Sequence, residues 1–563
     1  MRILLAALVA LSMLMQQPAG DRPAGNTRGT RSVVMARNGA IATSQPLATA
    51  AGLKVLQDGG NAIDAAVTAA AVLSVVEPTM NGPGGDLFAI VYSAKDHKVH
   101  GLNASGRAPA AATLDEFKKR NLQHVPLRGE LSVSVPGVVD GWNELLTKHG
   151  TRTLAQALEP AIRYARDGYA VSEIIAGQWK EVESLLSRDA KAAAVFLPGG
   201  KAPAPGDVFR NPALASSLEQ IARGGRDVFY KGAIAKAIAD DMQRRNGLLT
   251  AKDLADHHAD WVEPLSTTYR GYQVLELPPN TQGVTALEML NILEGFDLKS
   301  LGHNTAAYLH VMVEAKKIAF ADRGAWIGDP SSTPPKAIER MLSKDYAAER
   351  RKEINPDKAS EYKALTLTGT AAPPADPEPA GRGDTIYMTA ADSQGNVISL
   401  IQSLYETFGS GIVAGDTGIV LHDRANLFSL TPGHPNQIAP GKRPFHTLVP
   451  AMVMKDGAPW LSFGVMGGDM QAQGHAQVLA NLIDFGMNIQ EAGEAPRFRH
   501  SGNGLALESA FTADARNGLT ARGHHVTGGT GAWGGFQGIL IDPKTRVLMA
   551  GSDPRKDGMA AGW

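Results

Sequence analysis

The clearest pattern along the chain is a pair of helix-forming segments between residues 44 and 78. The segment SQPLATAAGLKVLQ is followed by DGGN, where Gly59 and Gly60 should end the first helix. Asn61 can cap the second helix, with Asp64 behind it. The second segment, AIDAAVTAAAVLSVVEP, is apolar on almost every face, which predicts a helix buried between layers.

Elsewhere helical and extended patterns alternate in blocks. The strand-like segment LFAIVY (87–92) follows the turn NGPGGD (81–86), and further helices are predicted over 154–167, 212–222, 233–244, 283–295 and 305–322. After Thr385 strands and glycine turns dominate, with one strong helix near 471–485. Strict βα alternation is absent from the sequence, so a layered α+β fold is favoured over a parallel barrel.

Length and charge narrow the function classes. At 563 residues the chain can form two or more packed units, or one large layered domain with insertions. Its formal net charge is −1, and no basic run carries interleaved aromatic residues, so we expect no nucleic-acid partner. The sequence has no cysteine, which excludes a disulfide scaffold and a thiol enzyme.

The N-terminus has the features of a secretory signal. Met1 and Arg2 precede the apolar segment ILLAALVALSMLM (3–15), and small residues follow in QQPAG. We therefore predict a signal peptide over residues 1–20, a secreted or periplasmic location, and no membrane association of the mature protein. A buried first helix is the alternative.

A Pro/Gly/Ala-rich stretch interrupts the chain at about 368–384 and stops abruptly at Thr385. The sequence AAPPADPEPAGRGD (371–384) cannot hold a helix or a central strand, whereas TIYMTAA (385–391) is strongly strand-like. We predict a flexible linker followed directly by a strand.

The strand beginning at Thr385 is predicted to form a hairpin with residues 397–404, through the turn DSQGN (392–396). If the turn closes symmetrically about Gln394, Thr385 lies opposite Ser403, with the two hydroxyl groups on one face. Such a pair is often merely structural. A cut between Asp384 and Thr385, however, would give Thr385 a free α-amino group beside its own hydroxyl, which supplies a nucleophile and its base on one residue.

A second glycine-rich stretch, SFGVMGGDMQ (462–471), can contribute to the same chemistry. The backbone N–H groups of Gly467 and Gly468 can face a developing oxyanion, although a plain strand-to-helix turn explains the pattern equally well.

Motifs for metal or nucleotide chemistry are weak. The segment GTGAWG (529–534) matches G-x-G-x-x-G but has no helix pattern after it, and DHHAD (256–260) places adjacent histidines about 100° apart on a helix. We therefore expect no metal and no cofactor.

Many motifs occur in one order that resembles the γ-glutamyltransferase (glutathione hydrolase) family of N-terminal-nucleophile enzymes. The resemblance covers roughly residues 31–563 and rests on PLATAAGLKVLQDGGNAIDAAVTAAAVLSVVEP, VPGVVDGW (135–142), ELPPNTQG (276–283), EAKKIAFADR (314–323), GDT (383–385), FGSGIVAGDTGIVL (408–421), PGKRP (440–444), MGG (466–468) and GSDPR (551–555).

The resemblance implies an αββα four-layer sandwich, with two stacked antiparallel sheets between helical layers. It also implies a precursor that cleaves itself between Asp384 and Thr385, giving a large fragment (21–384) and a small catalytic fragment (385–563). These fragments would form a heterodimer, and a dimer of such heterodimers is an alternative assembly. Thr385 would be the nucleophile, Ser403 its supporting hydroxyl, and Gly467 and Gly468 the oxyanion-hole glycines.

Substrate recognition departs from the family pattern. The family arginine that grips a substrate α-carboxylate is matched by Ser105, with Arg107 two residues further on, and the acidic pair that holds the α-ammonium is matched by Arg424 and Leu427. His446 and Thr447 replace a serine pair. A guanidinium in place of a carboxylate reverses the charge of the pocket and suits a substrate carboxylate, unless Asp423 neutralises Arg424 locally.

These departures resemble a side branch of the family that includes oxamate amidohydrolase-like and cephalosporin-acylase-like proteins. We expect a small-molecule amide substrate that binds Arg424, Tyr405, His446, Thr447 and Arg107. The acyl donor would be a γ-glutamyl compound such as glutathione or a related carboxylate-ended acyl amide. The alternatives are a glutaryl- or oxamate-type amidase with little γ-glutamyl activity, and an inactive binding member of the family.

Overall fold

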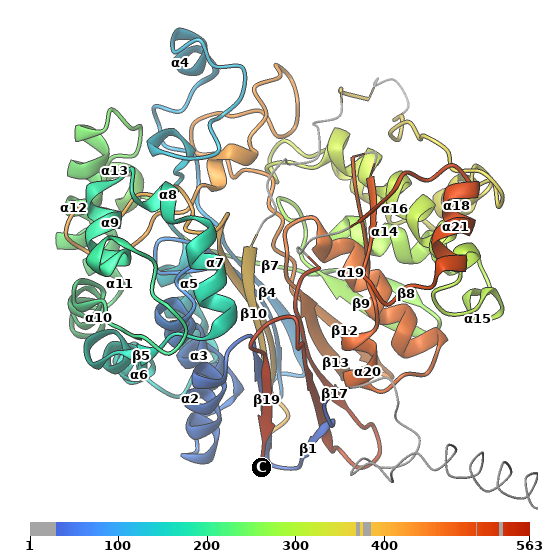
Figure 1. Ribbon diagram of the computed structural model, residues 1–563, viewed down its shortest axis with the longest axis horizontal. Coiled ribbons are helices and arrows are strands. Elements are labelled where there is room, and N and C mark those ends of the chain that lie inside the picture. The colour runs from blue at the N-terminus through green and yellow to red at the C-terminus, as the bar shows by residue number, and fades with distance from the viewer. Residues whose placement is uncertain (1–29, 368–371, 375–383, 503, 529–532) are drawn as a thin grey trace, which may run out of the picture.

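Two seven-stranded antiparallel sheets lie face to face at the centre of the molecule, and helices cover the outer face of each (Figure 1). The computed structural model describes residues 30–367, 372–374, 384–502, 504–528 and 533–563. The predicted signal peptide, most of the predicted linker and most of the segment 529–534 lie outside these ranges. The predicted αββα four-layer sandwich is confirmed.

The first sheet, here called the nucleophile sheet, carries Thr385 on strand β10, next to the central strand β11. Its strands, in spatial order, are β19 (Met559–Gly562), β2 (Gly39–Thr43), β10 (Asp384–Asp392), β11 (Val397–Tyr405), β3 (Asp86–Ser93), β4 (Lys98–Ala104) and β7 (Asp260–Val262).

The second sheet, here called the glycine-pair sheet, leads into Gly467 and Gly468 from its central strand β13. Its strands, in spatial order, are β1 (Val34–Ala36), β18 (Leu548–Ser552), β17 (Phe536–Ile541), β13 (Ala458–Val465), β12 (Ala451–Lys455), β9 (Tyr272–Glu276) and β8 (Leu265–Tyr269).

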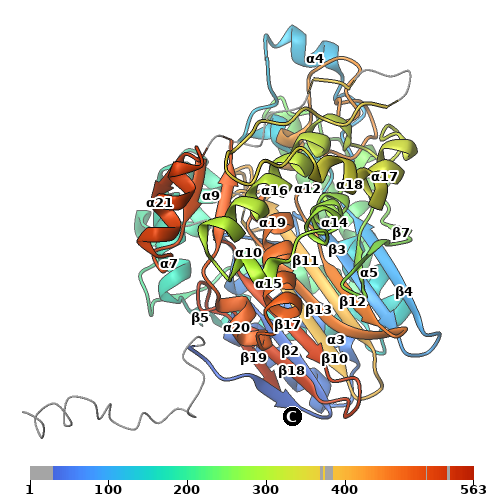
Figure 2. The same ribbon diagram turned by 90° about the vertical axis from the view of Figure 1, so that its right-hand side faces the viewer.

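Each sheet has its own helical layer. The nucleophile sheet is covered mainly by α2 (Pro46–Gln57), α3 (Ala62–Val76), α5 (Val138–His149) and α6 (Leu154–Asp167), with α7 (Glu173–Glu181), α9 (Ala190–Phe196), α10 (Pro212–Gly224) and α12 (Ala233–Arg244) further out. The glycine-pair sheet is covered by α14 (Gly283–Leu293), α16 (Ala306–Trp326), α19 (Met470–Leu479) and α20 (Ile489–Glu494) (Figure 2). Within the described ranges, no helix is long and apolar enough to cross a bilayer.

Helix α3 confirms the prediction of a helix buried on every side. All its residues from Ala62 to Val76 are buried, and Asn61 and Asp64 form a reciprocal capping box at its start. The predicted helices 154–167 and 233–244 match α6 and α12 residue for residue. The helix expected near 471–485 is α19, continued by a π-helical turn, Ala480–Asp484.

Apolar side chains fill the space between the two sheets. Phe88 and Ile401 from the nucleophile sheet pack there with Met452 and Ile539 from the opposite sheet. Side chains on one face of a strand recur at every second residue. Asp86, Thr385 and Ser403 therefore face the same space, at one end of their strands.

Candidate active site

The hydroxyl groups of Thr385 and Ser403 are adjacent, as the hairpin prediction required. Strands β10 and β11 pair in the predicted register from Ile386–Gln402 to Ala391–Val397. The pairing shifts by one residue before Ile386, so Asp384 rather than Thr385 is the next residue in the ladder, opposite Tyr405. Despite this bulge, Oγ1 of Thr385 donates a hydrogen bond to Oγ of Ser403 at 3.4 Å.

The supporting hydroxyl is itself held by the backbone. The N–H of Tyr405 donates to Oγ of Ser403 at 2.7 Å. Ser403 is fully buried and Thr385 is 1% exposed, so the pair is shielded from bulk water in the intact chain. A hydroxyl with a fixed partner holds the Thr385 side chain in one rotamer.

The strand that leads into the glycine pair packs across the inter-sheet space from the strand of Thr385. Thr389 Oγ1 donates to Ser462 Oγ at 2.7 Å, and Tyr387 packs on Gly464, where a Cβ would lie 2.5 Å from the ring. The same two-residue step leads along β10 towards Thr385 and, past the end of β13 at Val465, towards Met466 and Gly467.

Both glycines adopt backbone angles that suit a turn presenting amide groups. The φ angles are 113° at Gly467 and 58° at Gly468, a region that other residues rarely occupy. Their carbonyls accept hydrogen bonds from Met470 N at 3.0 Å and Gln471 N at 3.1 Å. Among the residues that the structure describes, neither glycine N–H has a hydrogen-bond partner, which is the arrangement that an oxyanion hole needs.

A polar clamp behind the turn fixes it to the rest of the site. Gln282 Nε2 donates to the carbonyls of Thr447 at 2.7 Å and Gly468 at 3.2 Å. Arg323 Nη1 donates to Gln282 Oε1 and to Asp469, each at 2.7 Å. Gln282 and Arg323 lie in motifs that carried the family resemblance, but their contacts with the glycine turn could not be inferred from sequence.

One edge of the buried Arg424 guanidinium, formed by Nε and Nη2, is not used by hydrogen bonds within the described part of the chain. Its side chain is fully buried, its Nη1 donates to Thr447 Oγ1 at 3.0 Å, and its guanidinium stacks 4.5 Å from the ring centroid of Tyr405. Nε and Nη2, the two donors on the opposite edge of the guanidinium, have no hydrogen-bond partner in the described part of the chain. Burial lowers the pKa of Arg424 and Asp86 opposes that effect.

Asp423 makes its closest ion pair with Arg128 instead of Arg424. Its Oδ2 lies 3.7 Å from Arg128 Nη1, and Glu406 lies 3.8 Å from the same guanidinium. Burial raises the pKa of Asp423 to about 7, and Arg128 opposes that shift. Among the described residues no direct ion pair joins Asp423 to Arg424, although each charge acts on the pKa of the other. The expected local neutralisation of Arg424 by Asp423 therefore acts through space and not through a direct pair. Sequence reasoning did not single out Arg128.

Asp86 joins the segments that carry the predicted substrate residues. Its Oδ1 accepts a hydrogen bond from Gly106 N at 2.9 Å, and its Oδ2 accepts one from His446 Nε2 at 3.1 Å. Nδ1 of His422 lies 3.4 Å from the same Oδ2. Burial alone would raise the pKa of Asp86, but His422 and His446 lower it well below its usual range.

His446 has a definite protonation state in this network. Leu448 N donates to its Nδ1 at 3.2 Å, so the ring proton is on Nε2 and points to Asp86. Burial and the neighbouring Arg424 lower the pKa of His446 to about 3. His446 is thus a neutral donor that orients the segment leading to Thr447.

Arg107 belongs to a separate cluster. Its guanidinium donates to Asp260 at 2.9 Å and to the His258 carbonyl at 2.9 Å, and Arg443 pairs with the same aspartate. The structure thus brings Thr385, Ser403 and Tyr405 together with Arg424, Thr447 and His446, whereas Arg107 is held elsewhere. Leu427 packs in an apolar group that includes Tyr405.

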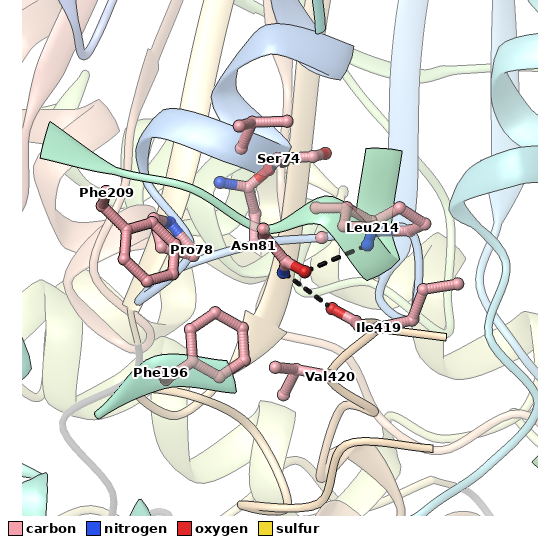
Figure 3. A pocket seen from close by; sticks show the side chains of 13 residues that line it. Ser74, Pro78, Asn81, Phe196, Phe209, Leu214, Ile419 and Val420 are labelled. Atoms are coloured by element: carbon pink, nitrogen blue, oxygen red, sulfur yellow. Dashed lines mark hydrogen bonds between the residues drawn. The ribbon is translucent and has the colours of Figure 1, made fainter. Parts of the chain in front are cut away.

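A small crevice in the helical layer does not extend this site. It lies where α3 and the loop after it meet the 418–420 segment, and Phe196, Phe209 and Leu214 line it (Figure 3). The Asn211 amide bridges Gly418 O at 3.1 Å and Leu214 N at 3.0 Å. Its lining is mostly apolar, and no charged side chain contributes to it, so we assign it a packing role.

Comparison with known proteins agrees with this geometry. The sequence profile of the family described as Gamma-glutamyltranspeptidase matches residues 48–563. The chain belongs to this family. It is therefore an enzyme of the γ-glutamyltransferase type, with hydrolase or acyltransferase chemistry.

Three relatives illustrate the breadth of the family. The chain is 40% identical over 528 residues to the glutathione hydrolase-like YwrD proenzyme of Bacillus subtilis (strain 168), covering 92% of this chain and 97% of that protein. It is 37% identical over 518 residues to the acylase ACY 1 proenzyme of Pseudomonas sp. (strain SE83), covering 90% of each. The crystal structure of cephalosporin acylase from Bacillus halodurans superposes with a TM-score of 0.89 at 42% identity, covering 97% of this chain and 99% of that one.

Proposed function

We propose that this family member is a self-cleaving threonine amidohydrolase for acyl groups that end in a carboxylate. Thr385 is the nucleophile, and Arg424 binds the free carboxylate of the acyl group. The observation that carries the proposal is the open Nε–Nη2 edge of the buried Arg424, a geometry that matches the two oxygens of one carboxylate.

Maturation is the first step. The Thr385 hydroxyl attacks the carbonyl carbon of Asp384, the C–N bond breaks, and an ester to Oγ1 and a free α-amine are formed. Water then hydrolyses the ester and leaves Asp384 as a C-terminal carboxylate. The result is a large fragment ending at Asp384 and a small fragment, 385–563, as the names of proenzyme relatives suggest.

The two fragments would remain together after the cut. Within the nucleophile sheet, β10 of the small fragment pairs with β2, and β11 pairs with β3. In the glycine-pair sheet, β12 pairs with β9 and β18 with β1. Main-chain ladders of this kind, together with the shared core, support a stable heterodimer.

Turnover uses the amine that maturation creates. The α-amine of Thr385 takes the hydroxyl proton as Oγ1 attacks the substrate amide, and the N–H groups of Gly467 and Gly468 stabilise the oxyanion. The leaving amine takes the proton, and water hydrolyses the acyl ester. Ser403 keeps Oγ1 oriented through both half-reactions.

The acyl donor we favour lacks an α-ammonium group. Leu427 lies where the family has an acid, and the nearest ion pair of Asp423 is with Arg128. Relatives named cephalosporin acylase and acylase ACY 1 support an acylase activity. The donor we favour is a glutaryl amide, because a glutaryl group is a γ-glutamyl group without its α-amine. Glutathione and other γ-glutamyl compounds are the second candidate, supported by the glutathione hydrolase-like relative.

The pattern of residues 1–20 supports export.

The test compares kcat/KM for glutaryl and γ-glutamyl p-nitroanilide. The wild type should prefer the glutaryl compound, and Arg424→Glu should lose roughly 100-fold on it, because a buried charge partner is reversed. Arg424→Lys keeps the positive charge but cannot donate two parallel hydrogen bonds to one carboxylate. Its kcat/KM for the glutaryl compound should therefore lie between those of the wild type and Arg424→Glu. A decisive preference of the wild type for γ-glutamyl would overturn the assignment of Arg424.

A further inference from the structure

A second cluster of ligand-type side chains lies on the outer helical layer of the glycine-pair sheet. His310 and Glu314 lie one turn apart on α16, and His524 follows α21 (Ala513–Ala521). All three residues are buried, and one donor atom from each lies within 4.8 Å of the other two. We propose that His310, Glu314 and His524 form a binding site for a divalent transition-metal ion, with Zn²⁺ as the best match.

The donor set fits such an ion. Two imidazole nitrogens and one carboxylate oxygen are ligands that Zn²⁺ accepts, and Mg²⁺ or Ca²⁺ prefer oxygen ligands. Nδ1 of His310 and Nε2 of His524 already face each other at 2.8 Å. Because the His310 proton is on Nε2, the N–H of His524 Nε2 donates to Nδ1 of His310. When an ion binds between the two nitrogens, the His524 proton moves to Nδ1 of the same ring, and the nitrogens need to separate by only a fraction of an ångström.

The groups around the cluster are those that orient metal ligands. His310 Nε2 donates to the Asn355 carbonyl at 2.7 Å, which leaves Nδ1 as the lone-pair nitrogen. Glu314 Oε2 accepts hydrogen bonds from Ser360 N at 2.9 Å and Tyr362 OH at 2.6 Å, which leaves Oε1 for the ion. A carbonyl behind a histidine and donors behind a carboxylate are common outer partners of metal sites.

Lys317 is the competing cation. Its Nζ lies 2.9 Å from Glu314 Oε1, an ion-pair contact without hydrogen-bond geometry, and donates to the Ser360 carbonyl at 3.1 Å. An arriving metal ion must displace this ammonium from Oε1. Lys317 therefore weakens metal binding at this site. Its removal should increase the metal affinity, an effect that a cluster with a purely structural role would not show.

The site joins parts of the chain that the proposed maturation separates. His310 and Glu314 belong to the large fragment, and His524 belongs to the small fragment; this consequence, unlike the ion binding itself, rests on the proposed function. Arg323, which clamps the glycine turn, lies on the same helix, thirteen residues (about 20 Å) beyond His310 and nine residues (about 14 Å) beyond Glu314. The ion would brace the heterodimer and take no part in the reaction at Thr385.

The experiment is a titration of EDTA-treated protein with Zn²⁺ and Co²⁺, using calorimetry and the visible Co²⁺ spectrum. The protein is prepared both as wild type and as the uncleaved Thr385→Ala chain, so that failure of processing does not affect the result. We expect one ion per chain with a dissociation constant of about 1 µM or tighter and an intense Co²⁺ band of low coordination number.

Three variants of the site and one control variant test the assignment of the ligands. His524→Ala and Glu314→Gln should weaken binding by roughly 100-fold, whereas His525→Ala, an exposed neighbour, should leave it unchanged. Lys317→Gln should tighten it about 10-fold. The proposal is overturned if wild-type protein binds no ion, or if His524→Ala and Glu314→Gln bind as wild type does. Should these two variants fail to fold, an octahedral aqua-type Co²⁺ spectrum of the wild type would overturn it.

Discussion

Asp86 and Ser403 are direct partners across strands β3 and β11, so a fully buried carboxylate stands beside the hydroxyl that contacts Thr385, the proposed nucleophile. In the proposed mature enzyme they lie on different fragments. Asp86 also holds Gly106 and His446, and through His446 the segment of Thr447. One buried aspartate thus connects the nucleophile sheet with the side chains around Arg424.

Asp86→Asn should destabilise the protein by about 1–3 kcal/mol near neutral pH, because the new amide cannot accept every hydrogen bond that the carboxylate accepts. The pKa of Asp86 is lowered on folding, so its stabilisation is present above its unfolded value and disappears as the solution is acidified. Urea unfolding at pH 6 and pH 3.5 should show a smaller gap between wild type and variant at the lower pH. Asp345→Asn, an exposed change, is the control.

Thr385→Ala should block both maturation and turnover, since it removes the hydroxyl that both steps need. A denaturing gel should show one band for the variant and two for the wild type. Thr385→Ser should still mature. Ser403→Ala should slow both steps by roughly 100-fold through loss of orientation. Two bands and full activity in Thr385→Ala would show that another residue is the nucleophile.

Gly467→Ala should lower kcat by about 100-fold or more, because a displaced turn no longer presents its amide to the oxyanion. A Cβ there would lie 3.0 Å from Gly534 Cα, at a φ of 113°. Gly457→Ala is the matched control: its φ is 79° and a Cβ would meet nothing within 4 Å. It should show backbone strain of similar size without loss of activity. Equal kcat values for the two variants would contradict the oxyanion role.

Tyr405→Phe should affect substrate binding without lowering the stability of the fold. The Tyr405 hydroxyl is buried and has no hydrogen-bond partner within the described ranges, so its removal should leave the free energy of unfolding unchanged or raise it. KM for the glutaryl anilide should increase if this hydroxyl contacts the substrate. Tyr387→Phe is the contrast, because the Tyr387 hydroxyl pairs with Ser399 at 2.7 Å, and its loss should destabilise by ~1 kcal/mol.

Substrate binding should depend on pH through Asp423. Its folded pKa is raised to about 7, so its ionisation lowers stability as pH rises from its unfolded value through 7, and adds a negative charge near Arg424. KM for the glutaryl anilide should rise roughly threefold between pH 6 and pH 8. Asp423→Asn should flatten this rise. An unchanged pH profile in the variant would assign the dependence to another group, such as the Thr385 amine.

Much of the fold could be predicted because its signals are local. The all-apolar period of residues 62–76 required a helix buried on every side, and the turn at 392–396 set the register that brings Thr385 to Ser403. The one-residue bulge before Ile386 could not be predicted, since it depends on how the strand end packs. The family motifs then indicated the αββα sandwich and the candidate site residues.

The sequence by itself determined the helices, the hairpin, the nucleophile candidate and the change of charge at position 424. Only the tertiary structure decided that Asp423 makes its closest ion pair with Arg128, that the guanidinium of Arg424 keeps one edge open, and that Arg107 is held by Asp260. It also decided that His310 and Glu314 meet His524. Periodicity and turn chemistry act over a few residues and leave a trace in the sequence, whereas the partner of a buried charge is set by segments that are hundreds of residues apart and meet only in the folded chain.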